Sequence, residues 1–175
     1  MKKMLTFASL VVLAAVSARA ATVTWQMTGQ TDSSGNPLSG GIAYLFDTST
    51  VTEAAFMDSL EKGTFLDEGG VASKAIASKA SNGSGGIAQT KIGNYSNQSV
   101  TLFMVVFDGP EPTADNYKKS APVTKTFTTT NQTYNFNDAL SSSTWTPNPM
   151  AVPEPTAVAL LALGLAALGL KRKVA

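Results

Sequence analysis

The sequence predicts a mainly β protein, an antiparallel sandwich-like domain of about six short strands with one helix. Three observations lead to this fold class. Residues Thr22–Thr28 alternate polar and apolar side chains, as a half-buried strand does. The runs Gly41–Asp47 and Ser99–Asp108 are more continuously apolar, which predicts central strands. The rest of the body is rich in Ser, Thr, Gly and Asn, as in exposed strands and turns. A small α+β domain is the alternative.

One helix is predicted near residues 51–62. Thr50 and Glu53 have the spacing of a capping box, which satisfies backbone N–H groups at a helix start. Phe56 and Leu60 lie four residues apart, so they share one face of a helix. Gly63 then supplies the residue type that most often follows a helix end. We therefore expect a helix that ends at Gly63.

The second half of the body predicts further strands, at Val123–Thr128 and Thr133–Asn137, because both stretches alternate. Residues 64–93 fit no regular period, and no element is predicted there. Residues Gly109–Lys119 are polar and predict a loop. Ser and Pro dominate after Asp138, so residues 141–151 are expected to form a linker.

Charge and composition exclude several classes of protein. Between residues 21 and 152 there are 7 Lys, no Arg and 11 Asp or Glu, so this section carries 7 − 11 = −4. A section this acidic has no basic surface for a phosphate backbone, which argues against nucleic-acid binding. The chain has no Cys and no His, so Cys-His and Ser-His-Asp relays and the usual zinc sites are excluded. We expect neither an enzyme nor a cofactor.

The first 20 residues have the layout of a secretory signal peptide. Met1-Lys2-Lys3 is positively charged, and the apolar run Met4–Val16 follows. Ala18 and Ala20 then place small residues at the −3 and −1 positions before Ala21. At about 1.5 Å per residue the apolar run is too short to cross a bilayer as a helix. Export by the general secretion machinery and cleavage after Ala20 are therefore expected.

The C-terminal end has a second signal-like layout. Val152, Pro153, Glu154 and Pro155 precede the apolar stretch 157–170, which favours a helix without polar groups. The basic residues Lys171, Arg172 and Lys173 would stay on the cytoplasmic side of a membrane. The stretch is about 21 Å long as a helix, short of a core of about 30 Å, so it spans only marginally as a transmembrane helix. A permanent anchor is the alternative.

These residues resemble the PEP-CTERM sorting signal: a Pro-Glu-Pro motif, a short apolar helix and a terminal basic cluster. The resemblance implies recognition and cleavage by exosortase, a membrane-embedded processing enzyme. It also implies a passage through the inner membrane to the cell surface or extracellular matrix of a Gram-negative bacterium that makes exopolysaccharide. Pro110-Glu111-Pro112-Thr113 repeats the letters Pro-Glu-Pro-Thr without an apolar helix after them, which predicts a surface loop.

The chain therefore divides into four parts. Residues 1–20 are the signal peptide, 21–140 the exported mostly β domain, 141–151 the linker and 152–175 the sorting signal. The sequence predicts an exported surface or matrix protein whose specific role it does not name. The alternative function is a glycan- or calcium-binding module at the cell surface.

Binding sites for that alternative can be named, although no metal site is predicted outright. Asp108, Glu111 and Asp115, with Asn116, crowd one loop and could offer oxygen ligands to calcium. Tyr95, Tyr117 and Trp145 fall in polar segments, where exposed aromatic rings could stack on sugars of an exopolysaccharide. Asp47 and Asp108 end apolar strands, and a hydrolase would need two such carboxylates across a cleft. Strand-end Asp residues usually cap turns instead.

Overall fold

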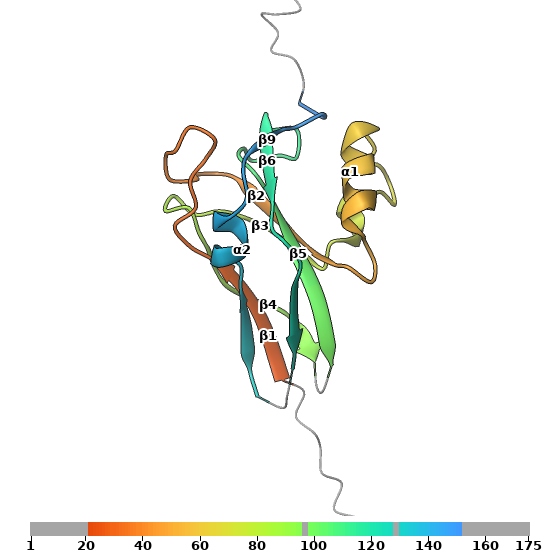
Figure 1. Cartoon of the computed structure of the whole chain (residues 1–175), viewed down its shortest axis with the longest axis vertical. Coiled ribbons are helices and arrows are strands. Elements are labelled where there is room, and N and C mark those ends of the chain that lie inside the picture. Colours follow the sequence, from red (N-terminus) through yellow and green to blue (C-terminus); the bar gives the residue numbers. More distant parts are fainter. Residues whose placement is uncertain (1–20, 96–97, 128–129, 152–175) are drawn as a thin grey trace, which may run out of the picture.

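A computed structural model describes residues 21–95, 98–127 and 130–151 of the chain. It contains a mainly β domain, and the predicted fold class is confirmed: two sheets pack face to face and helices are few (Figure 1). The elements are β1 Ala21–Met27, β2 Ile42–Asp47, α1 Glu53–Glu61, the 3₁₀ turn η1 Ala72–Lys74, β3 Ala77–Ala80, β4 Ile87–Tyr95, β5 Ser99–Phe107, β6 Asn116–Lys119, β7 Val123–Thr126, β8 Gln132–Asn135, α2 Asn137–Ser141 and β9 Thr146–Pro147.

The smaller sheet has the order β4-β1-β8, and the larger sheet has the order β3-β2-β5-β6-β9, with β7 also paired to β5. All the strand pairs of the larger sheet are antiparallel. In the smaller sheet β1 runs antiparallel to β4 but parallel to β8. The sandwich is therefore not purely antiparallel, because β8 pairs in parallel with β1, the first strand of the domain.

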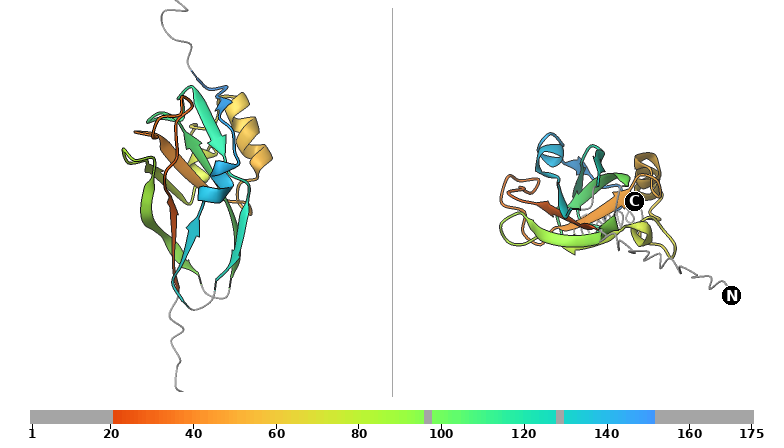
Figure 2. Two further views of the ribbon diagram at one scale, coloured as in Figure 1. Left: turned by 60° about the vertical axis from the view of Figure 1, so that its left-hand side comes forward. Right: turned by 90° about the horizontal axis from the view of Figure 1, so that it is seen from below.

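Strands β2 and β5 lie at the centre and bury both faces, as their continuous apolar sequences predict. One face contributes to an inter-sheet cluster: Val23, Trp25, Met27, Leu38, Ala43, Leu45, Ile87, Val100, Leu102, Met104, Val106, Phe127, Tyr134, Phe136 and Leu140. The other face, with α1, forms a helix-side cluster: Tyr44, Phe46, Val51, Phe56, Leu60, Phe65, Phe103, Val105, Phe107 and Tyr117. The domain therefore has three layers, with the larger sheet in the middle (Figure 2).

Helix α1 forms where the sequence predicts it, but its cap differs. The N-cap is Thr52, whose side chain accepts a hydrogen bond from the backbone N–H of Ala55 at 3.1 Å; the predicted capping-box residue Thr50 lies outside the helix. At the other end Gly63 has φ of 67° and its N–H donates to the carbonyl of Leu60. The N–H of Thr64 donates to the carbonyl of Ser59, which completes a Schellman motif.

Two segments predicted as irregular are strands. The stretch 64–93 contains β3 and most of β4, and the predicted loop Gly109–Lys119 ends in β6. Strand β6 pairs with the second half of β5, and β7 pairs with its first half. Between them, Ser120 accepts a hydrogen bond from the N–H of Met104 through its side chain at 2.9 Å. This hydrogen bond keeps the segment between β6 and β7 attached to β5.

Buried tyrosines predict a loss of stability at alkaline pH. Burial raises the pKa of Tyr44, Tyr95, Tyr117 and Tyr134 above the ordinary value of about 10. Above that pH the unfolded chain releases the phenolic protons first, so it binds fewer protons than the folded chain and stability falls as pH rises. We expect the free energy of unfolding to fall above about pH 10, and less steeply in Tyr134→Phe.

Urea unfolding of both proteins between pH 9 and pH 12 measures the difference in slope. Tyr134→Phe also removes a hydrogen bond from its hydroxyl to the carbonyl of Val100, at 2.5 Å. That loss lowers stability by about 1–3 kcal/mol at pH values where Tyr134 is protonated in the folded state, so the comparison uses the slopes rather than the absolute stabilities. Equal slopes in the two proteins would show that Tyr134 does not contribute to the alkaline transition.

Candidate functional site

Residues 143–151, called the C-terminal strap below, run along the surface of the domain. The sequence predicts a linker over 141–151, and the structure corrects this prediction. Helix α2 buries Leu140 in the inter-sheet cluster, and β9 then pairs with β6. The hydroxyl of Ser143 donates to the carbonyl of Lys119 at 2.6 Å. The folded domain therefore continues to Ala151, because these contacts attach the segment on both sides of β9.

Asn148 is the most firmly held residue of the strap. Its side chain is buried, and its Nδ2 donates to the carbonyls of Pro112 at 2.6 Å and Ala114 at 2.8 Å. Its backbone N–H donates to the carbonyl of Asp115 at 2.8 Å, and its Oδ1 accepts from the N–H of Met150 at 3.1 Å. Each such bond contributes about 1 kcal/mol net. Together they fix the strap to the loop between β5 and β6.

Trp145 attaches the strap to a second place. Its indole N–H donates to the carbonyl of Thr31 at 3.1 Å, and its ring lies 5.1 Å from the ammonium nitrogen of Lys118. Lys118 is buried, and it donates to the side-chain oxygen of Gln30 at 2.8 Å. Burial lowers the pKa of Lys118, since removal from water disfavours the charged ammonium. Its two partners, the amide of Gln30 and the ring of Trp145, carry no formal negative charge. The ring of Trp145 thus covers a buried amine.

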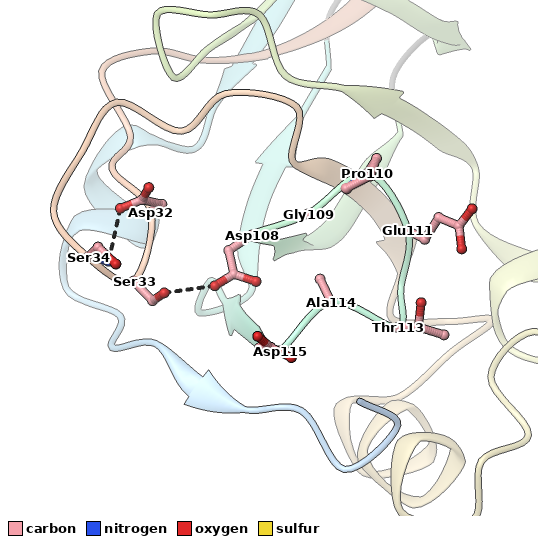
Figure 3. Close-up of a pocket in the computed structure, with 10 residues that line it drawn as sticks. All are labelled: Asp32, Ser33, Ser34, Asp108, Gly109, Pro110, Glu111, Thr113, Ala114 and Asp115. Carbon is pink, nitrogen blue, oxygen red and sulfur yellow. Dashed lines mark hydrogen bonds between the residues drawn. The ribbon is translucent and has the colours of Figure 1, made fainter. Parts of the chain in front are cut away.

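An open acidic cavity of about 470 Å³ lies beside the strap (Figure 3). Asp108 occupies its centre and accepts hydrogen bonds from Ser33 Oγ at 2.8 Å and Asn116 Nδ2 at 2.9 Å. Its other oxygen accepts from the backbone N–H of Asn116 at 3.1 Å. The lining residues come from two loops: Asp32, Ser33, Ser34, Asp108, Gly109, Pro110, Glu111, Thr113, Ala114 and Asp115. Asp108 therefore joins the two loops that form the cavity.

The structure does not gather the weak calcium candidates into one ligand set. In Figure 3, Glu111 lies on the far side of the loop from Asp108. Within residues 21–95, 98–127 and 130–151, no three carboxylates are close enough together to hold a metal ion. Asn116 uses its amide on Asp108 and on Ser33. Calcium binding stays a prediction.

The two strand-end carboxylates lie far apart. Ile42 pairs with Phe107 and Asp47 pairs with Leu102, so Asp47 and Asp108 are at opposite ends of the β2–β5 ladder. At about 3.3 Å per residue they are separated by roughly 17–20 Å, too far for a glycosidase pair. Asp47 accepts hydrogen bonds from the N–H and the hydroxyl of Ser49, as a turn-capping residue does.

The aromatic candidates for sugar binding are all engaged in packing. Tyr117 is buried in the helix-side cluster, with its hydroxyl 3.2 Å from Met57 Sδ. Tyr95 stacks on Phe127, and Trp145 packs against the inter-sheet cluster. The three rings therefore do not form one surface, and glycan binding stays a prediction.

Most of the predicted signal residues lie outside the residues that the structure describes. This holds for the cleavage residues, the sorting motif, the basic cluster and the predicted transmembrane helix: Ala18, Ala20, Val152, Pro153, Glu154, Pro155, Lys171, Arg172, Lys173 and 157–170. Ala21, the predicted first residue of the mature chain, is the first residue of β1 and pairs with Tyr95. Cleavage after Ala20 would therefore leave β1 whole.

Sequence reasoning missed the residues that hold the strap. Asn148 is followed by a proline, and this dipeptide marks a turn, so a local Asx-turn could have been expected. Its contacts with the β5–β6 loop are 34 and 36 residues away in sequence and leave no local signal. Lys118 and Gln30 likewise occupy stretches that look exposed, because polar residues surround them.

Comparison with known proteins identifies the C-terminal end. The family model of the PEP-CTERM protein-sorting motif matches residues 151–173. The match begins at the last residue of the strap and includes the Pro-Glu-Pro motif and the basic cluster. No curated protein and no solved structure matches the chain. In the part of the chain that the structure describes, none of the helices has the length and apolar character needed to span a membrane.

Proposed function

We propose that this chain, which carries a PEP-CTERM protein-sorting motif at residues 151–173, delivers a non-catalytic β domain to the surface or extracellular matrix of a Gram-negative bacterium. The motif implies export and processing by exosortase at the membrane. The matched segment carries the proposal, because it combines the motif with an apolar stretch and a basic end. The delivered domain acts as a structural or interaction protein there.

The arrangement of the acidic residues supports a non-catalytic role. General acid–base chemistry without His or Cys would depend on carboxylates, tyrosines or lysines. Asp47 at the end of β2 and Asp108 directly after β5 are separated along the sheet, and both accept hydrogen bonds from loop residues, Asp47 from Ser49 and Asp108 from Ser33. Both carboxylates stabilise loops in this arrangement, which is the usual role of strand-end Asp residues.

The position of the two ends of the domain supports delivery from a membrane. Strand β1 begins at one end of the long axis, and the strap ends at the opposite end (Figure 1). A precursor held at its C-terminal end therefore places β1 and the loops near it away from the membrane. Removal of the sorting segment would release a domain whose two termini are both attached by strand pairing.

The intact mass of the protein from its native host tests this proposal. We expect a chain that lacks the first 20 residues and the basic residues Lys171–Lys173, recovered from the surface or matrix fraction. The same gene in a host without exosortase is the control, and there the chain should keep its C-terminal residues and stay with the membrane. Retention of the basic residues in the native host would contradict the proposal and identify a permanent anchor.

A further inference from the structure

The strap leaves very little chain between the domain and the sorting motif. Among the residues that the structure describes, which end at Ala151, Asn148 is the last with a buried side chain, and Pro153 follows it by five positions. A fully extended chain covers at most about 3.6 Å per residue, so these five steps span no more than about 18 Å. Met150 and Ala151 shorten this reach, because their N–H groups donate back to Asn148.

The domain is wide compared with this arm. A folded domain of this length has a radius of gyration of about 14 Å, so its width exceeds the reach of the arm. A partner that encloses the motif must therefore contact the end of the domain from which this arm, residues 149–152, emerges. That end carries the β5–β6 loop, because Asn148 is bonded to the carbonyls of Pro112 and Ala114.

We infer that the strap is a fixed short arm, with Asn148 as its positioning residue, and that the β5–β6 loop end of the domain lies against the membrane-embedded processing enzyme while the motif is engaged. This inference rests on the proposed function, because it needs the motif to be processed. It adds a surface of the domain, residues 110–115 and 146–150, to the recognition of a short C-terminal signal. The opposite end of the domain faces away from the enzyme.

Photo-crosslinking in membranes of the native host tests the contact. A photo-reactive amino acid replaces Glu111, which is exposed on the β5–β6 loop. The matched position is Ser99, an exposed residue at the start of β5, and β5 begins near the other end of the long axis (Figure 1). We expect the full-length precursor to crosslink to the processing enzyme from position 111 and not from position 99. Equal yields from the two positions, or none from position 111, would overturn the inference.

Two changes in the arm sharpen this test. A spacer of about 15 Gly and Ser residues after Ala151 lengthens the free arm about fourfold, so the crosslink from position 111 should fall roughly eightfold. Asn148→Ala releases part of the strap and should lower the yield about threefold, whereas exposed Asn36→Ala should leave it unchanged. A yield from position 111 that is insensitive to both changes would also refute the fixed arm.

Intact mass in the same samples separates this inference from the proposed function. If the precursor is processed but position 111 does not crosslink, the fixed arm is wrong and the proposed function stands. If the precursor keeps its C-terminal residues in the native host, the proposed function fails and the inference fails with it. Melting temperatures of Asn148→Ala and Asn36→Ala show whether the domain stays folded at the assay temperature.

Discussion

Replacing Pro153, Glu154 and Pro155 with alanine should leave every copy of the chain with its C-terminal residues and hold it at the membrane. The family match covers these residues, and the matched motif implies processing by exosortase. The replacement leaves the apolar stretch 157–170 and the basic cluster unchanged, so insertion should persist while cleavage stops. Intact mass and fractionation of the native host measure both effects.

The chain contains a matched control for this experiment. Pro110-Glu111-Pro112-Thr113 has the same four residue types, but the structure places it in the β5–β6 loop. Alanine at positions 110–112 changes the proposed contact surface but leaves the C-terminal signal itself unchanged, so it should reduce processing far less than alanine at 153–155. Circular dichroism of the purified domain checks that this loop variant is folded. Normal processing of the first variant, or an equal loss in both, would show that the Pro-Glu-Pro residues at 153–155 are not the specific signal.

Phe46→Ala should destabilise the domain by about 3–5 kcal/mol, which is enough to unfold a large fraction of a marginally stable protein. Phe46 is fully buried on the helix-side face of β2. Its ring lies 5.3 Å from that of Phe103 and 6.2 Å from that of Phe56. Truncation would remove these contacts and leave a cavity between α1 and the larger sheet.

Urea unfolding followed by tryptophan fluorescence measures this loss, since Trp25 is fully buried in the folded state. The control is Leu66→Ala, because Leu66 is a large apolar residue with 48% of its surface exposed. We expect the control to change stability by less than about 0.5 kcal/mol. A loss below about 1 kcal/mol for Phe46→Ala would mean that α1 repacks onto the sheet more freely than the ring contacts indicate.

Sequence reasoning finds the central elements because their burial is visible locally. Strands β2 and β5 are apolar on both faces. Helix α1 has apolar residues four positions apart, Phe56 and Leu60, and is followed by Gly63. The same reasoning misses β3, whose sequence Ala-Ser-Lys-Ala is mostly exposed at a sheet edge. It also misses β6, because Lys118 is buried by a tertiary contact with Gln30 that has no counterpart in the neighbouring residues.

The candidate site shows the same division. The sorting motif is readable because all its parts are adjacent in the sequence, and the family match confirms it. The strap is not readable, because its bonds join residues 143–151 to segments near residues 31, 112 and 119. Ser and Pro in this stretch suggest a linker, yet a polar segment can be ordered when its amides meet carbonyls of another loop.

The parallel pairing of β1 with β8 joins strands from the two ends of the domain sequence, so it determines when folding can be completed during export. Thr24 in β1 pairs with Thr133 in β8, and their hydroxyls lie 2.9 Å apart although 109 residues separate them in the sequence. If the chain is exported from its N-terminus, as the proposed function requires, β1 emerges first and β8 becomes available only after almost the whole domain has followed. Long-range pairing of this kind folds slowly and leaves strand edges open meanwhile. On export from the N-terminus, folding would therefore be completed only after β8 has emerged, when little more than α2, the strap and the sorting segment remains to follow.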